Sequence, residues 1–256
     1  MKLRTAEVKE FLDLKADQYN NRGFITDDPV SIPHRYSLKE DIEISGFLVA
    51  TIAWGNRKSI VKNGHRMMDL MDNAPYDFVL GHAATDLKRF EKFVHRTFNA
   101  ADLAYFVKAL RHIYRKKGGI ETLFNQHATE GSLQPAIHHF RKAFFELPFE
   151  KRTAKHVSDP MGGSAAKRIN MYLRWMVRKD KRGVDFGIWK SIQASQLSCP
   201  LDIHSGKVAR KLGLLSRAQN DARAVEELDR NLRRLDPADP VKYDFALFGL
   251  GVFEHF

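Results

Sequence analysis

Apolar residues recur at helical spacing along almost the whole chain. Residues 37–54, SLKEDIEISGFLVATIAW, predict a buried helix, and the methionine-rich segment 57–71 predicts an amphipathic helix that ends before Pro75. The same period predicts further helices at about 77–81, 86–96, 100–116, 120–127, 133–146, 165–178, 203–213, 222–234 and 240–248. Alternating strands between hairpin turns are absent from the pattern, so we predict an all-α fold.

Two stretches interrupt the helical pattern. Residues 147–163, LPFEKRTAKHVSDPMGG, contain two prolines and paired glycines, which predict a loop and a hinge between subdomains. Residues 178–200 form a second connector. The helices before and after these stretches are therefore expected to belong to different parts of the fold.

Composition and charge indicate a globular protein with a polyanionic partner. With 256 residues, 43% of them apolar and 11% aromatic, the chain can bury a sizeable core. The net charge of +11 is spread along the sequence, which favours binding to nucleic acid, although a merely soluble basic surface would show the same balance. We expect a monomer that binds duplex DNA.

The cysteine content and the N-terminal sequence narrow the cellular setting. The single cysteine, Cys199, excludes an internal disulfide, a zinc knuckle and a four-cysteine iron–sulfur cluster. The first 21 residues carry charges throughout, and no run of about 18 apolar residues occurs, so we expect neither a signal peptide nor membrane insertion. A cytoplasmic, nucleoid-associated protein is the expectation.

The segment MGGSAAKRINMYLRW, residues 161–175, places a lysine where a cation is unusual. Lys167 opens a predicted helix, and the helix dipole disfavours a positive charge there. The small residues before it allow close approach of another backbone and leave amides free for a phosphate; these residues are Gly162, Gly163, Ser164 and Ala165. We interpret this segment as a phosphate-binding turn that presents a lysine.

The helix that follows has two different sides. At about 100° per residue, Asn170, Met171, Arg174 and Arg178 share the side of Lys167, opposite the apolar face. We expect Arg174 and Arg178 to contact DNA phosphates. The alternative is a solvated basic stripe on an ordinary amphipathic helix.

The segment PLDIHSGKVARKLGLL, residues 200–215, contains a second candidate. Asp202 stands just before a helical pattern, and Gly213 stands where a left-handed residue would end that helix. Asp202 is therefore a natural N-cap as well as a candidate catalytic carboxylate. A metal site formed by Asp202 and His204 is a weaker alternative, because no further ligand cluster accompanies the pair.

Together the two segments resemble the helix-hairpin-helix DNA glycosylases, the superfamily of endonuclease III and the oxoguanine glycosylases. That family's hairpin reads Leu-Pro-Gly-Val-Gly-Arg-Lys-Thr-Ala-Asn, and MGGSAAKRIN matches it at Gly163, Ala165, Lys167 and Asn170. LDIHSGKVARKLGL, residues 201–214, is similar to the later family element and places Asp202 on the catalytic aspartate. The whole chain, including EDIEISGFLVATIAWGNRK and DPVKYDFALFGLG, also resembles a bacterial family of unknown function near this superfamily.

The resemblance implies a fold and a reaction. The fold would be two interlocked helical subdomains: a bundle at 38–160, the hairpin and catalytic helices at 161–215, and the segments 1–37 and 216–256 packed together. Lys167 would be the nucleophile that forms a Schiff base with the sugar, and Asp202 would stabilise positive charge on it. The hairpin residues 162–165 and Asn170 would bind DNA.

The sequence also departs from the family pattern. Lys167 and Asp202 stand 35 residues apart, as in the long-spaced archaeal oxoguanine glycosylases, so an inserted connector is implied. The hairpin has no leading Leu-Pro and has Ala165 in place of its second glycine. No protein-bound cofactor is expected apart from a monovalent cation at the hairpin.

Excision of a base requires that it leave the DNA stack, which calls for a wedge and a pocket. Asn56 and Arg57, in the loop after Trp54, are the wedge candidates, although an ordinary helix cap has the same sequence. The stacking-pocket candidates, each of which could instead belong to the core, are Trp54, Met171, Trp175 and Phe248.

The sequence therefore predicts a DNA glycosylase with lyase activity on an oxidised base, with 8-oxoguanine as one candidate. Two alternatives stay open. One is a non-catalytic DNA- or RNA-binding protein with the same hairpin scaffold, and the other is a metal-dependent nuclease that uses Asp202 and His204.

Overall fold

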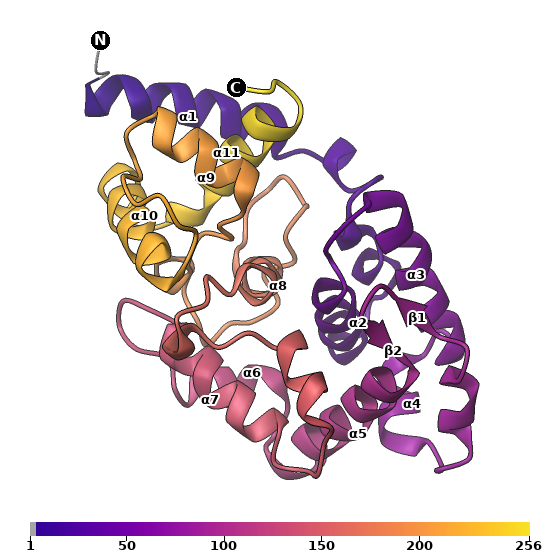
Figure 1. Ribbon diagram of the computed structural model, residues 1–256. Coiled ribbons are helices and arrows are strands. Elements are labelled where there is room, and N and C mark those ends of the chain that lie inside the picture. Colours follow the sequence, from indigo (N-terminus) through magenta and orange to yellow (C-terminus); the bar gives the residue numbers. More distant parts are fainter. Residues whose placement is uncertain (1–3) are drawn as a thin grey trace.

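The computed structural model describes residues 4–256 and consists almost entirely of helices (Figure 1). The α-helices are α1 (Thr5–Tyr19), α2 (Lys39–Thr51), α3 (Arg57–Leu70), α4 (Pro75–Gly81), α5 (Ala100–Lys116), α6 (Ile120–Asn125), α7 (Gln134–Phe144), α8 (Lys167–Val177), α9 (Ile203–Lys211), α10 (Ala222–Leu235) and α11 (Tyr243–Val252). Short 3₁₀ helices lie at Arg22–Phe24, Pro29–Ser31, Pro33–Arg35, Asp86–Phe90, Lys151–His156, Pro160–Gly162, Ala194–Gln196 and Pro240–Lys242. The predicted all-α fold is confirmed. None of the helices within residues 4–256 is long and apolar enough to span a membrane.

The larger hydrophobic core is formed by helices α2 to α8 and the segments that connect them. Phe47 of α2 lies at its centre, with the rings of Phe106, Phe140 and Phe144 at centroid distances of 5.4–5.8 Å. Helix α2 is buried on all sides from Ile42 to Thr51, because apolar residues cover most of its circumference and Glu43 and Ser45 are hydrogen-bonded inside the protein. Helix α8 packs directly against it.

A second, smaller core is formed by α1, α9, α10 and α11. Helix α11 packs between α1 and α9, so the two ends of the described chain lie side by side (Figure 1). Residues 1–3 of the predicted terminal segment 1–37 lie outside the described residues. Helix α8 lies between α2 and the group of α9, α10 and α11 in Figure 1. Its first residue, Lys167, faces Asp202 just before α9.

One local prediction was wrong, and one helix was missed. Residues 86–96 do not form one helix; they form a 3₁₀ turn followed by the strand β1 (Val94–His95), which pairs antiparallel with β2 (Phe98–Asn99). Arg96 adopts a left-handed conformation in the turn, while the rings of Phe93 and Phe98 are buried on either side of it. Helix α1 was not predicted, because its buried stripe of Val8, Leu12 and Ala16 is narrow and surrounded by charges.

The connector of residues 178–200 has no regular structure except one 3₁₀ turn, as predicted. It crosses α8 and buries Asp185 and Trp189. The indole Nε1 of Trp189 donates to the carboxylate of Glu43 at 2.6 Å, which ties the connector to α2. The connector therefore covers a side of α8 that the sequence pattern left open to solvent.

Candidate active site

Lys167 is the first residue of α8, and the hairpin before it fixes its position. Gly163 and Ala166 adopt left-handed conformations, with φ of 88° and 46°, which turn the chain sharply into the helix. The hydroxyl of Ser164 accepts the backbone N–H of Ala166 at 3.1 Å and closes this turn. The lysine therefore stands at the positive end of the helix dipole, as the sequence predicts.

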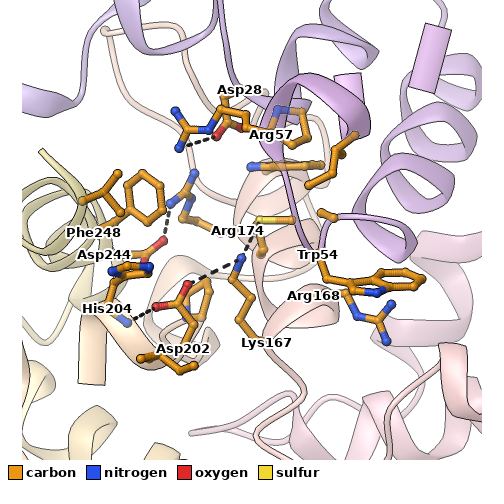
Figure 2. A pocket seen from close by; sticks show the side chains of 18 of the residues that line it. Asp28, Trp54, Arg57, Lys167, Arg168, Arg174, Asp202, His204, Asp244 and Phe248 are labelled. Carbon is orange, nitrogen blue, oxygen red and sulfur yellow. Dashed lines mark hydrogen bonds and ion pairs between the residues drawn. The ribbon is translucent and has the colours of Figure 1, made fainter. Parts of the chain in front are cut away.

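Asp202 is the N-cap of α9, and its two carboxylate oxygens have different neighbours. Oδ1 accepts the backbone N–H groups of His204 at 2.9 Å and Ser205 at 3.0 Å. Oδ2 faces the amine of Lys167, with Nζ at 3.9 Å (Figure 2). About a quarter of each side chain is exposed, so the pair is accessible. Asp202 thus caps α9 and faces Lys167 at the same time.

The pair borders a cavity of about 590 Å³ between the two cores. The cavity walls come from the N-terminal segment, the α2–α3 loop, α8, the start of α9 and α11. The residues that line it are Phe24, Asp28, Pro29, Ala53, Trp54, Gly55, Arg57, Ile60, Lys167, Arg168, Met171, Arg174, Trp175, Pro200, Asp202, Ile203, His204, Asp244, Phe248 and Val252. The volume is in the range of ordinary small-molecule sites.

The four predicted pocket residues all border this cavity, but they do not have equal roles. Met171, Trp175 and Phe248 line it, and the sulfur of Met171 lies 3.7 Å from the amine of Lys167. The ring of Trp54 instead points away from the Lys167–Asp202 pair (Figure 2). It stacks on His156 at 5.9 Å and lies under the guanidinium of Arg168 at 4.7 Å. Trp54 therefore forms a wall and not a stacking platform.

The two wedge candidates already have partners. Asn56 caps α3, because its side chain accepts the backbone N–H of Ser59 at 3.1 Å. The guanidinium of Arg57 lies 5.3 Å from the ring centroid of Phe248 and 4.0 Å from Oδ2 of Asp28. Arg57 thus reaches from α3 across the cavity to α11. A wedge at this loop stays a prediction.

Burial contradicts the predicted phosphate contacts of Arg174 and Arg178. Both residues are 3% exposed. Arg174 pairs with Asp185 at 3.2 Å and with Asp244, whereas Arg178 pairs with carboxylates of the connector and of the segment before α11. The helical period correctly separated these arginines from the apolar face, but it could not show that the connector covers them.

Asn170 is also buried and does not face a DNA surface. Its Nδ2 donates to the carbonyl oxygen of Ala165 at 3.1 Å, and its Oδ1 accepts from Gln134 at 3.1 Å. The predicted DNA contact is therefore wrong, and Asn170 stabilises the hairpin from inside. Gly162 and Gly163 are exposed, and Ser164 and Ala165 are half-buried.

The hairpin is tied to two further helix starts. Ser164 forms an antiparallel bridge with Asp221, and the carbonyl oxygen of Gly163 accepts the backbone N–H of Ala222 at 3.0 Å. The side chain of Asn220 donates to the carbonyl oxygen of Asp202 at 2.8 Å. The N-termini of α8, α9 and α10 are thus held together on one edge. A monovalent cation at this hairpin stays a prediction.

Sequence reasoning missed two acidic residues in the cavity, Asp28 and Asp244. Burial raises the pKa of Asp244 to about 6, although the neighbouring Arg174 opposes the shift. Burial also raises the pKa of Asp28, and the positive charges of Arg57, Arg174 and Lys167 oppose that shift. An aspartate inside the apolar segment YDFALFGLG was the available signal for Asp244. Nothing in the sequence around Asp28 marks it as a cavity residue.

The described residues contain no group of three or more His, Cys, Asp or Glu side chains that could hold a metal ion. A protein-family model with the description "Protein of unknown function (DUF2400)" matches residues 28–253, which include every cavity residue except Phe24. No curated protein and no solved structure matches the chain.

Proposed function

We propose that this chain, which belongs to the DUF2400 family, is a DNA N-glycosylase with associated lyase activity on an oxidised base. The observation that carries the proposal is the approach of Lys167 Nζ to Asp202 Oδ2, at 3.9 Å, on the wall of an accessible cavity. These residues are far apart in sequence, and both open a helix. An amine beside a carboxylate is the pair that this reaction requires.

The reaction would begin at C1′ of the damaged nucleotide. The ammonium of Lys167 must first lose a proton to solvent, whereas the role of Asp202, whose Oδ2 lies 3.9 Å from Nζ, requires that it stay a carboxylate. As the glycosidic bond breaks and the base leaves, positive charge develops on the sugar, and the carboxylate stabilises it. The lone pair of Nζ forms the bond to C1′ while the leaving base takes up a proton. The C1′–O4′ bond then breaks and O4′ takes up the proton of the amine, which gives the ring-opened Schiff base. Loss of a proton from C2′ and of the 3′ phosphate then cuts the strand.

The composition of the cavity supports the same assignment. Among the described residues that line it, Lys167 is the sole lysine, and the lining includes no serine, threonine or cysteine. Lys167 is therefore the one amine among the described lining residues that could form a Schiff base. Met171 and Phe248 supply apolar surface against which a planar base would pack, whereas Trp175 is fully buried behind the wall and belongs to the larger core.

DNA binding would use the edge where three helices begin. The exposed glycines of the hairpin allow a phosphate to approach the start of α8. Arg223 is exposed at the start of α10 and Lys207 is exposed in the middle of the short helix α9, and they replace the buried arginines as candidate phosphate contacts. The net charge of +11 favours such a partner.

The test is borohydride trapping across a panel of duplexes that each contain one oxidised base, with and without a chelator. Borohydride reduces the Schiff base to a stable amine, so we expect a covalent complex with at least one duplex, and equally in chelator. Lys167→Gln should abolish the complex and keep DNA binding, while the control Lys116→Gln, at an exposed lysine of α5, should keep the complex. Strand cleavage that a chelator abolishes would instead indicate a metal-dependent nuclease.

A further inference from the structure

Asp28 brings a buried carboxylate to the cavity wall at the end away from Asp202 (Figure 2). The residue is 7% exposed, and it precedes a short 3₁₀ turn that begins at Pro29. Its Oδ1 accepts the backbone N–H of Val30 at 3.1 Å. Its Oδ2 lies 4.0 Å from a guanidinium nitrogen of Arg57, which is longer than a hydrogen bond. One oxygen of a buried carboxylate is thus poorly paired.

Such an arrangement favours a ligand that donates hydrogen bonds. A buried carboxylate is costly unless N–H or O–H groups compensate for the lost water. Burial raises the pKa of Asp28, which reflects this cost. The capping contact to Val30 uses one lone pair of Oδ1, and a carboxylate has about four acceptor positions in all. The remaining positions can accept two adjacent N–H donors.

We propose that Asp28 is a specificity-determining residue that accepts two neighbouring N–H groups of the extruded base, next to a carbonyl that faces Arg57. This inference rests on the proposed glycosylase function. The pattern matches the edge of a 6-oxo-2-aminopurine, which presents a carbonyl oxygen, a ring N–H and an exocyclic amine in a row. A 6-aminopurine presents one donor beside a bare ring nitrogen, and a uracil-type edge presents one donor between two carbonyls that repel a carboxylate.

Asp28 and the Lys167–Asp202 pair lie on different segments of the chain, so their proposed roles can be tested separately. Asp28 belongs to the N-terminal segment, whereas Lys167 and Asp202 open α8 and α9. Asp28→Asn keeps an oxygen that can accept the N–H of Val30, so the turn should still form. It replaces one acceptor with an N–H₂ group that opposes the donors of the base. The variant should therefore change the choice of substrate more than the fold.

The experiment compares single-turnover excision of 8-oxoguanine with excision of 8-oxohypoxanthine, which lacks only the exocyclic amine. The amine supplies one of the two donors to the carboxylate, and one hydrogen bond to a charged group corresponds to a discrimination of about tenfold or more, so we expect wild type to favour 8-oxoguanine by at least about tenfold. Asp28→Asn should reduce the ratio to within about threefold. Asp27→Asn, which removes the same charge from an exposed neighbour, should keep the wild-type ratio. Thermal unfolding of each variant checks the fold.

The outcomes distinguish the inference from the function on which it rests. No excision and no trapping with any oxidised base would overturn both. Excision of other bases but of neither test base would overturn the role of Asp28 alone. Equal excision rates of the two bases by the wild-type protein would also overturn the role of Asp28, and this comparison needs no variant. A ratio that Asp28→Asn leaves unchanged would overturn that role as well.

Discussion

At the scale of single residues, the two carboxylate oxygens of Asp202 contact different groups. Oδ1 accepts two backbone N–H groups at the start of α9, and Oδ2 faces Lys167 at 3.9 Å. A cap needs only an acceptor oxygen, whereas charge stabilisation on a sugar needs the negative charge. The two roles can therefore be separated by substitution.

We expect Asp202→Asn to fold normally and to excise slowly. Asparagine caps helices about as well as aspartate, so the free energy of unfolding should change by only a few tenths of a kcal/mol. Excision should fall by about 10²-fold or more, because the neutral amide cannot balance charge on the sugar. Asp202→Ala should lose about 1 kcal/mol of stability as well. Denaturant unfolding and single-turnover kinetics measure the two effects, and full activity in Asp202→Asn would reduce Asp202 to a helix cap.

The positions of some candidate residues could be predicted from the sequence, and those of others could not. Lys167 and Asp202 could be predicted, because each stands at a helix start within a recognisable motif. The burial of Arg174 and Arg178 could not, because a helical period assigns sides but does not tell which segment covers them. Asp28 reaches the cavity only through the path of the N-terminal segment, which leaves no local signal.

At the scale of elements, the contact of α1 with α11 depends on a glycine. A Cβ on Gly249 would lie 2.1 Å from the ring of Tyr19, so the two helices could not keep their present distance. We expect Gly249→Ala to lower the free energy of unfolding by about 1–3 kcal/mol, despite the better helix propensity of alanine. Gly81→Ala is the matched control, since a Cβ there meets nothing within 4 Å. Equal stability of the two variants in urea would contradict the packing described for α1 and α11.

Asp229 of helix α10 makes the free energy of unfolding depend on pH. Burial raises the pKa of Asp229 from 3.8 to about 6, although its hydrogen bond from the backbone N–H of Cys199 opposes the shift. The folded state therefore holds a proton more tightly than the unfolded state, and the stability present below about pH 4 is lost as the pH rises through about 6. The shift corresponds to about 2–3 kcal/mol.

The measurement is urea unfolding between pH 4 and pH 7. Asp229→Asn has no proton to lose and keeps an acceptor for Cys199, so the fall in stability over this range should be smaller than in wild type. The exposed control Asp27→Asn should follow wild type. A variant profile that is as steep as the wild-type profile would show that other groups cause the pH dependence.

Elements with a wide apolar stripe could be predicted from the sequence, and short or irregular ones could not. Helix α5 has the bounds that its period predicts, and its buried face is continuous from Leu103 to Ile113. The segment 86–96 also has apolar residues at helical spacing, Leu87, Phe90 and Val94, but a left-handed Arg96 turns it into a hairpin. Such a turn depends on the burial of Phe93 and Phe98 on both sides, which is a tertiary effect.

At the scale of the whole molecule, the starts of α8, α9 and α10 are joined into one edge beside the cavity. With a net charge of +11, this edge should bind duplex DNA with an affinity that falls steeply as salt increases. Lys207→Ala and Arg223→Ala should each reduce the slope of log K against log salt by about one unit, because each removes one phosphate contact. Fluorescence anisotropy at several salt concentrations measures the slope.

The control for this prediction is Lys116→Ala, which removes an exposed lysine at the end of α5, far from that edge in Figure 1. It should leave the slope close to the wild-type value. Binding that does not respond to salt would exclude an electrostatic interface. Equal changes in all three variants would indicate diffuse charge attraction without a defined edge.

The most direct test of the central claim is to identify the amino acid that becomes attached to DNA. The complex trapped with borohydride is digested with protease and nuclease, and the modified peptide is sequenced by mass spectrometry. We predict that the sugar remnant is on Nζ of Lys167, which faces Asp202 at 3.9 Å in the cavity. Attachment to another lysine or to the N-terminal amine, or excision without any covalent intermediate, would contradict Lys167 as the nucleophile.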